Sequence, residues 1–359
     1  MEKTLHRLAA VLALALPAAC AREDIGAARY GLDDCRRVAL IDSATGGIVR
    51  GAEDLALDAD SGRLFISAYD RRAAEKAARK RGAAPPSGGV YAVVIDDLFD
   101  PQTAELRIRA LAASGDFAGG LRPHGISYDA ANKELVFVNR SYARDGGKWK
   151  MTPHLRRIGA NGEAFVGAPA PAPCAANDVE ASGGAVITSF DHGGCGAGAT
   201  LENVFSLKRS GVSSQDGGVL FDRAVFANGL ARTAGGDIVM AATREKSLLV
   251  LDETDKGFGV AKRIALPGGP DNLTIAADGG VVAAVHPSLL KLTGTRKFGI
   301  GKAPSRIVKA DPDTGAVEIL FDDPKAKVFS AATAAVETGA GLVAGSVTDE
   351  GLMVCRAAS

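Results

Sequence analysis

The chain has 359 residues, of which 47% are hydrophobic and 23% are charged, so it is long enough to bury a full core. Its 42 basic and 42 acidic side chains give a formal net charge of zero. This balance predicts no nucleic-acid partner and no strongly charged binding tail. Glycine is abundant, at 44 residues, which is typical of a fold with many turns.

The first segment has the pattern of a secretory signal. Two basic residues precede an apolar run over residues 8–19, and this run is too short to span a membrane. We therefore predict an exported protein, periplasmic or secreted, with a signal over residues 1–21 and a single domain over 22–359. Ordinary cleavage after the small residues and lipoprotein cleavage before Cys20 both stay open. The second would leave a lipid anchor at Cys20, the one membrane contact expected.

Four cysteines follow the signal: Cys35, Cys174, Cys195 and Cys355. An even number of cysteines in an exported chain can pair into disulfides. A bridge between Cys35 and Cys355 would join the two ends of the domain, and Cys174 with Cys195 would then close a local loop. Three pairings are open for four cysteines, and four unpaired buried thiols are the alternative.

Strand patterns dominate the rest of the chain. Short aliphatic runs follow turn signals rich in Gly, Asn and Asp, and this combination predicts strands. Five such runs lie at residues 63–67, 134–138, 185–188, 237–241 and 280–284. One or two helical turns are expected over residues 71–81, followed by an exposed loop over 82–89. No long amphipathic helix is evident after the signal.

One sequence unit recurs along the chain: a polar pair, an apolar residue, a short strand, a turn and a second strand. The units open at Glu53-Asp54-Leu55, His124-Gly125-Ile126, Asn177-Asp178-Val179, Asn228-Gly229-Leu230 and Asp271-Asn272-Leu273, with a weaker sixth near Phe329-Ser330-Ala331. A repeat of roughly 40–50 residues with paired strands is typical of propellers. We predict an all-β fold, a six-bladed β-propeller, with loops of different length between its blades.

The polar residues that open the units predict a metal site. The innermost strands of a propeller begin at its central channel, so these residues should converge there. Carboxylate and amide oxygens without Cys or His clusters suit a hard cation such as Ca²⁺, although Mn²⁺ and Mg²⁺ also take oxygen ligands. A single Asn or Asp before a strand is usually a turn former. Five equivalent positions together indicate a shared site, and neighbouring residues that point to opposite sides could serve two ions.

Six segments, in order, resemble signature segments of the paraoxonase/arylesterase family. They are Glu53-Asp54, His124-Gly125-Ile126, Asn177-Asp178, Phe226-Ala227-Asn228-Gly229, Asp271-Asn272 and His286-Pro287. The likeness extends from about Gly51 to Pro287, and the terminal cysteine pair is also a trait of this family. The wider group contains gluconolactonases and strictosidine-synthase-like propellers. The resemblance implies a six-bladed propeller with two calcium ions stacked in its channel.

The resemblance also implies a ligand set for each ion. An upper, catalytic calcium would be held by Glu53, Asn177, Asn228, Asp271 and Asn272. A buried, structural calcium would be held by Asp54, Asp178 and the backbone oxygen of Ile126. The upper ion would polarise the carbonyl of a lactone or aryl ester, and a nearby base would activate water.

His124 is the base that the resemblance implies, because an imidazole titrates near neutral pH. In animal members of the family a second histidine partners the first, but the corresponding segment here is Val138-Asn139-Arg140. Glu53, Asp271, His192 and His286 are therefore candidates for the base as well.

Three functions follow from these observations. The first is a calcium-dependent hydrolase of small-molecule lactones or aryl esters. The second is a sugar-lactone hydrolase of the gluconolactonase type; that group uses one metal and lacks the paired Glu-Asp and Asn-Asp arrangement. The third is a non-enzymatic exported propeller that binds a partner and keeps calcium as a structural ion.

Overall fold

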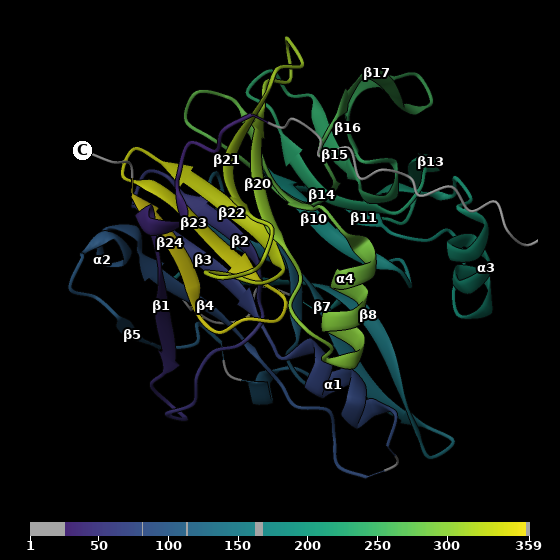
Figure 1. Ribbon diagram of the computed structural model, residues 1–359. Coiled ribbons are helices and arrows are strands. Elements are labelled where there is room, and N and C mark those ends of the chain that lie inside the picture. The colour runs from purple at the N-terminus through teal and green to yellow at the C-terminus, as the bar shows by residue number, and fades with distance from the viewer. Residues whose placement is uncertain (1–25, 81, 113, 162–167, 357–359) are drawn as a thin grey trace, which may run out of the picture.

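A computed structural model describes residues 26–80, 82–112, 114–161 and 168–356. The predicted signal, including Cys20, lies outside the described residues. Six small sheets surround a common centre and form a six-bladed β-propeller, as the sequence predicts (Figure 1). The innermost strands contact one another around a closed ring, in which β2 contacts both β6 and β22. No helix among the described residues is long and apolar enough to cross a membrane.

Each blade begins with its innermost strand and continues outward. The innermost strands are β2 (Ala52–Asp58), β6 (Pro123–Asp129), β10 (Ala176–Ser182), β14 (Ala227–Arg232), β18 (Gly269–Ile275) and β22 (Ala332–Thr338). The second strands are β3 (Arg63–Ala68), β7 (Glu134–Asp145), β11 (Ala185–Phe190), β15 (Ile238–Ala242), β19 (Val281–His286) and β23 (Gly341–Ser346).

The outer strands complete the blades. The third strands are β4 (Gly89–Val94), β8 (Lys148–Gly159), β12 (Ser210–Ser214), β16 (Ser247–Thr254), β20 (Ser305–Ala310) and β24 (Leu352–Arg356). Outermost strands are β9 (Ala170–Pro171), β13 (Val219–Ala224), β17 (Gly257–Ala265), β21 (Val317–Asp323) and β1 (Cys35–Asp42). The short strand β5 (Glu105–Ile108) pairs parallel to β1, so the first blade keeps three strands and the last sheet has five.

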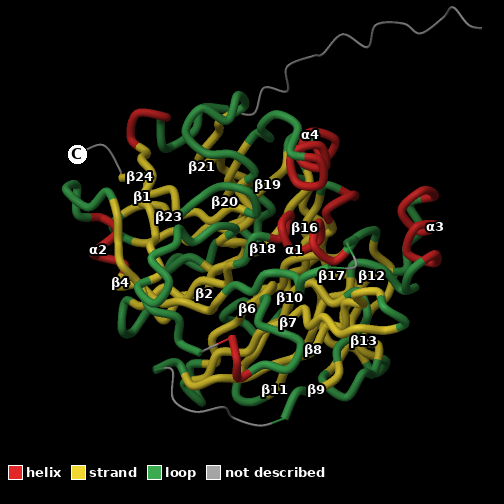
Figure 2. The backbone as a smooth tube through the Cα atoms, turned by 90° about the horizontal axis from the view of Figure 1, so that it is seen from below, coloured by secondary structure: helices red, strands yellow, loops and turns green. Residues whose placement is uncertain are grey.

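Helices lie in the connections between strands (Figure 2). The α-helices are α1 (Arg71–Ala78), α2 (Ile95–Phe99), α3 (Ala197–Phe205) and α4 (Leu289–Thr293). The short helical turns are η1 (Leu32–Asp34), η2 (Ser114–Asp116), η3 (Thr243–Glu245) and the π-helical η4 (Gly294–Phe298). The sequence predicts α1, whereas α3 and α4 were not expected.

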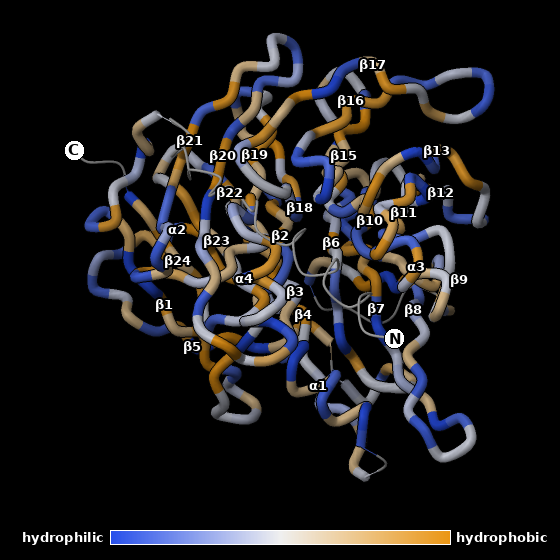
Figure 3. The backbone as a smooth tube through the Cα atoms, turned by 45° about the vertical axis from the view of Figure 1, so that its right-hand side comes forward, coloured by the Kyte–Doolittle hydropathy of each residue, from blue (hydrophilic) through white to orange (hydrophobic). Residues whose placement is uncertain are grey.

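Apolar side chains fill the spaces between neighbouring blades. Phe65 and Val90 of the first blade pack with Ile126, Leu135 and Phe137 of the second. Apolar residues concentrate in the strands, while many loops are hydrophilic (Figure 3). This pattern follows from the aliphatic runs of the sequence, because a strand between two blades buries both of its faces.

The ring is closed by both ends of the domain. β1 pairs antiparallel with β24, and Cys35 lies opposite Cys355 in this ladder. These two cysteines form a disulfide, and Cys174 pairs with Cys195. The structure thus selects one of the three pairings that the sequence leaves open. Two disulfides indicate an oxidising compartment.

We expect the Cys35–Cys355 bridge to contribute more stability than the local one. Its two cysteines are 320 residues apart in sequence, against 21 for Cys174 and Cys195, and a longer closed loop restricts the unfolded chain more. Replacing both Cys35 and Cys355 by Ser should lower the free energy of unfolding by about 2–5 kcal/mol. Urea unfolding measured by circular dichroism tests this, with the Cys174→Ser/Cys195→Ser variant as the matched control. A larger loss in the control would contradict it.

Candidate functional site

Every innermost strand carries a register irregularity at its start, and in the first five blades the predicted polar residues stand there. In the sixth blade the irregularity lies around Thr333, three residues after the predicted Ser330. The breaks in pairing fall at residues 52/54, 123/126, 176/179, 227/230, 270/273 and 332/334. A β-bulge leaves backbone groups unpaired and re-aims the side chains beside it. All six blades therefore interrupt their pairing where their opening residues reach the ring of innermost strands.

Glycine allows these strand starts to approach one another. A Cβ atom on Gly125 would lie 2.3 Å from the Cα atom of Asp178 in the next blade. A Cβ atom on Gly229 would lie 2.5 Å from the backbone oxygen of Asp271. Such contacts exclude any larger side chain. The glycines of the two openings His124-Gly125-Ile126 and Asn228-Gly229-Leu230 thus bring neighbouring blades together at the channel.

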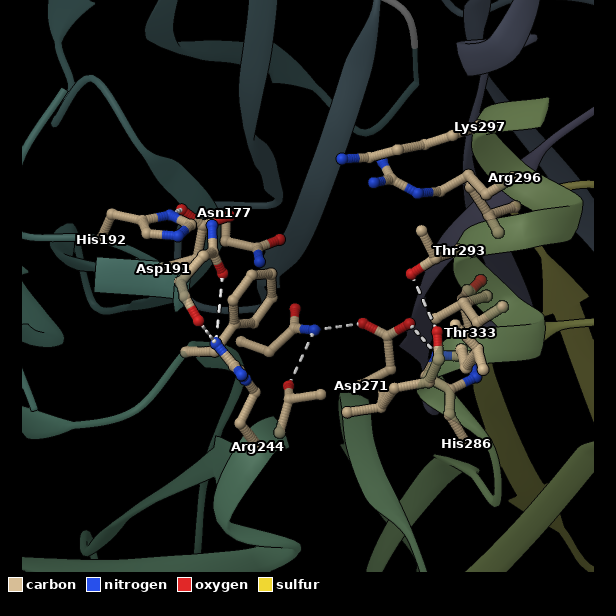
Figure 4. A pocket seen from close by; sticks show the side chains of 18 of the residues that line it. Asn177, Asp191, His192, Arg244, Asp271, His286, Thr293, Arg296, Lys297 and Thr333 are labelled. Carbon is tan, nitrogen blue, oxygen red and sulfur yellow. Dashed lines mark hydrogen bonds and ion pairs between the residues drawn. The ribbon is translucent and has the colours of Figure 1, made fainter. Parts of the chain in front are cut away.

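A cavity of about 700 Å³ lies above these strand starts. Four of the five residues predicted to hold the upper ion line it, namely Glu53, Asn177, Asn228 and Asp271. The fifth, Asn272, is buried and does not line the cavity; its Nδ2 donates to the backbone oxygen of Glu53 at 2.8 Å. Figure 4 shows the Asp271 carboxylate in the middle of the cavity. This carboxylate accepts a hydrogen bond from Asn228 Nδ2.

The residues predicted for the lower ion are buried outside this cavity. Asp54 accepts hydrogen bonds from the backbone N–H groups of Leu55, at 2.9 Å, and Ile126, at 2.8 Å. Asp178 accepts from Val179 and Leu230, both at 2.7 Å. Each carboxylate thus joins its own blade to the next one. Each also stands where two innermost strands meet.

Burial changes the acidity of both carboxyl groups. Burial, together with the negative charges of Asp178 and Glu53, raises the pKa of Asp54 well above its usual range. Burial raises the pKa of Asp178 to about 8, although two backbone N–H groups favour its charged form. Two carboxyl groups that disfavour each other's charge in a buried site are suited to share a cation.

The chemistry of the donors fits a hard cation. The Oδ1 atoms of Asn228 and Asn272 are buried and accept no hydrogen bond from any described residue. Buried oxygens of this kind normally have a partner, and a cation that takes oxygen ligands would supply one. No group of three or more His, Cys, Asp or Glu side chains within the described residues is arranged to hold a metal. A site here must therefore combine amide and carboxylate oxygens, which suits calcium better than zinc.

Three histidines each contact a carboxylate near the channel. His124 Nδ1 lies 2.7 Å from Glu53 Oε2, and His286 Nε2 lies 2.6 Å from Asp271 Oδ2. His192 Nδ1 lies 2.5 Å from Asp191 Oδ1. His192 and His286 line the cavity, but His124 does not and is 1% exposed.

The surroundings of His124 and His192 shift the pKa values of these two histidines in opposite directions. Burial, with the positive charge of Arg140, lowers the pKa of His124 to about 4 despite the nearby Glu53. At His192 burial alone would lower the pKa, but the Asp191 carboxylate outweighs it and raises the pKa above the usual value of 6.5. His192 thus lines the cavity, and the Asp191 carboxylate favours its charged form.

Arg140 stands where the resemblance would place a second histidine. Its side chain is buried, and Nη1 donates to the Tyr69 hydroxyl at 3.5 Å. A permanent positive charge here disfavours protonation of His124. The His–His pair of the resembling family is thus replaced by a neutral imidazole beside a guanidinium.

Several cavity residues were not predicted from the sequence. The basic side chains Arg71, Arg244, Arg296 and Lys297 line it, and α4 adds the apolar residues Leu289, Leu290 and Leu292. Thr333 supplies the polar opening of the sixth blade, and its Oγ1 donates to the Glu53 backbone oxygen at 2.7 Å. The register of the other repeats is the signal that could have found Thr333. The short segment 289–298 has no comparable signal.

Comparisons with known proteins give structural likeness at low identity. No family model matches the sequence, and no curated protein matches it. An aldose sugar dehydrogenase from Streptomyces coelicolor, solved with PQQ bound, has a TM-score of 0.50 and 10% identity, and covers 90% of this chain and 97% of its own. A gluconolactonase from Xanthomonas campestris has a TM-score of 0.47 and 14% identity, with 86% of each chain covered.

A luciferin-regenerating enzyme has a TM-score of 0.38 and 12% identity, and covers 90% of this chain and 94% of its own. At these identities likeness concerns the fold alone, because one fold hosts many functions. The class established here is a six-bladed β-propeller with a cavity at its channel that is lined by both polar and apolar side chains. The specific resemblance to paraoxonases rests on the sequence segments.

The raised pKa of Asp178 gives a prediction for the protein without calcium. The folded state then binds a proton at Asp178 that the unfolded chain releases near pH 4, so the free energy of unfolding should fall as pH rises from 5 to 8. Urea unfolding after chelation measures this. Asp178→Asn removes the titrating group and should reduce the dependence. A chelated wild-type protein that is equally stable at both pH values would contradict the prediction.

Proposed function

We propose that this protein is an exported, calcium-dependent hydrolase of lactones or aryl esters, of the paraoxonase kind. The observation that carries the proposal is the shared cavity. Glu53, Asn177, Asn228 and Asp271 come from four different blades and line it together with the Asp191–His192 pair. An oxygen-rich metal site beside a histidine that can exchange a proton is the arrangement that ester hydrolysis by activated water requires.

Calcium is proposed at two positions. The cavity-lining oxygens, with Oδ1 of Asn272, would hold the upper ion, and Asp54, Asp178 and the Ile126 carbonyl would hold the lower one. The unpartnered oxygens of Asn228 and Asn272 support the first position, and the two buried carboxyl groups support the second. When bound, the upper ion would polarise the substrate carbonyl and stabilise the negative charge that develops on its oxygen.

His192 is the proposed general base. Its Nδ1 faces Asp191, which orients the ring and leaves Nε2 with the lone pair in the neutral form. Nε2 is buried and has no hydrogen-bond partner among the described residues. With water admitted to it, Nε2 would take a proton from the attacking water and return it to the leaving oxygen. His124, which the sequence resemblance favours, is buried behind Glu53 and orients that carboxylate instead. His286 orients Asp271 in the same way.

The gluconolactonase-type alternative differs in its metal content. A single ion would occupy the cavity, and Asp54 with Asp178 would have no cation to share. The raised pKa values of these two carboxyl groups favour the two-ion account. A binding propeller without activity is the remaining alternative, and the activity measurement below separates it from a hydrolase.

Turnover of a small ester panel should require calcium. A δ-lactone, an acyl-homoserine lactone and phenyl acetate are assayed with the purified mature protein, with calcium and after chelation. Asn228→Ala and Asp271→Ala should each lower turnover by about 10²–10³-fold, because each removes part of the electrostatic stabilisation of the transition state. Asn132→Ala, in the turn between β6 and β7, is the matched control. No turnover by a folded, calcium-binding protein would favour a binding propeller.

His192→Gln should lower kcat by about 10²–10⁴-fold, as expected when a general base is removed. In the wild type, kcat/KM should rise with pH through a pKa above 6.5, because the base acts in its neutral form and Asp191 raises its pKa. His154→Gln is the control, since His154 on β8 does not line the cavity. A full loss of activity in His124→Gln with little effect of His192→Gln would reverse the assignment.

A further inference from the structure

One wall of the cavity carries an excess of positive charge that the proposed hydrolysis does not use. Arg71 lies at the start of α1, and Arg296 and Lys297 lie in η4, after α4. All three line the cavity. Figure 4 shows Arg296 and Lys297 extending from their helix into the cavity, on the far side from His286. Two insertions that are distant in sequence thus place their cations on one side of the cavity.

The carboxylate in this wall does not balance these charges. Glu75 Oε1 contacts Arg71 Nε at 3.1 Å and Arg296 Nη1 at 3.6 Å, so two guanidinium groups share one carboxylate. Lys297 forms no ion pair with any residue in the described part of the chain. The buried Arg140 adds a further positive charge nearby.

The acidity of Arg296 reflects this crowding. The positive charge of Arg71, assisted by burial, lowers the pKa of Arg296 to about 10 even though Glu75 is close. Repulsion among cations is costly unless an anion relieves it. One source of negative charge is the acidic floor of the cavity, which is formed by Glu53 and Asp271.

If calcium is bound, the negative charge of the floor is balanced without the cations of the wall. Two divalent ions would balance the four carboxylates of Glu53, Asp54, Asp178 and Asp271 without help from the wall. Arg71, Arg296 and Lys297 would then face the cavity with one carboxylate among them. The cavity, at about 700 Å³, is large enough for a molecule that spans the floor and this wall.

We propose that the cavity selects esters or lactones that carry an anionic substituent, a carboxylate or a phosphoryl group, which Arg296 and Lys297 bind with Arg71 while the scissile carbonyl lies at the floor. This inference rests on the proposed function. A guanidinium can bind both oxygens of such a group, and Lys297 adds a mobile point charge. Leu289 and Leu292, which also line the cavity, would contact the apolar body of the substrate.

The test compares three acetate esters that differ in one substituent: 4-acetoxybenzoate, 4-acetoxyphenyl phosphate and the neutral methyl 4-acetoxybenzoate. Wild-type kcat/KM should be higher for at least one anionic ester. Lys297→Met and Arg296→Met should each lower it about tenfold for that ester, the worth of one hydrogen bond to a charged group, and leave the neutral ester within about twofold. Lys291→Met, on α4, which continues as η4, and outside the cavity lining, is the matched control.

The outcomes are distinct. Preference for the benzoate assigns a carboxylate, and preference for the phosphate ester assigns a phosphoryl group. Equal kcat/KM for all three esters, or equal losses for charged and neutral esters in the variants, would overturn the inference while leaving the hydrolase intact.

If none of the esters is hydrolysed, the proposed function fails for this class, and binding still tests the inference. Calorimetry with 4-hydroxybenzoate and 4-hydroxyphenyl phosphate should then show binding that Lys297→Met weakens, whereas methyl 4-hydroxybenzoate should bind no more weakly to the variant. Absence of binding by both anions would overturn the inference.

Discussion

Four carboxyl groups buried at the centre of the ring are the constraint on which the rest of the structure depends. The residues Glu53, Asp54, Asp178 and Asp271 are all less than a tenth exposed. A buried charge costs several kcal/mol unless it is paired and hydrogen-bonded. Histidines contact Glu53 and Asp271, but Asp54 and Asp178 contact no described cation and rely on backbone N–H groups. Burial therefore raises the pKa of Asp54 and Asp178, and cations in the channel would allow both groups to lose their protons.

Ring closure makes the arrangement possible. Residues that lie far apart in sequence meet because six innermost strands begin around one channel, each with a bulge at its polar opening. The antiparallel pairing of β1 with β24 and the Cys35–Cys355 bridge hold the first and last segments in one blade. Stability and site geometry therefore depend on the same closure, because an open ring would separate Glu53 from its neighbours in the last two blades.

The sequence predicts the repeated part of the molecule well. Polar residues interrupt the aliphatic pattern at the first five blades, so the fold, five strand starts and six residues that line the cavity could be predicted: Glu53, Asn177, His192, Asn228, Asp271 and His286. The residues of the cavity wall could not be predicted from the sequence. α4 has only five residues before it continues as η4, which is too short for helical periodicity to appear.

The contacts between α1 and η4 could not be predicted from the sequence either. Arg71, Glu75 and Arg296 meet only because α1 and η4 leave different blades on the same side of the ring. The position of His124 behind Glu53 also depends on side-chain packing. Sequence motifs thus locate the residues near the channel, and tertiary structure decides which of them face the cavity.

The most direct test of the account is anomalous diffraction from crystals grown with calcium. We expect two calcium peaks in the channel. One should contact the oxygens of Glu53, Asn177, Asn228 and Asp271, and the other should lie between Asp54 and Asp178. Absence of a peak at both positions, in crystals where calcium is present at millimolar concentration, would contradict the central claim that the blade openings form a calcium site.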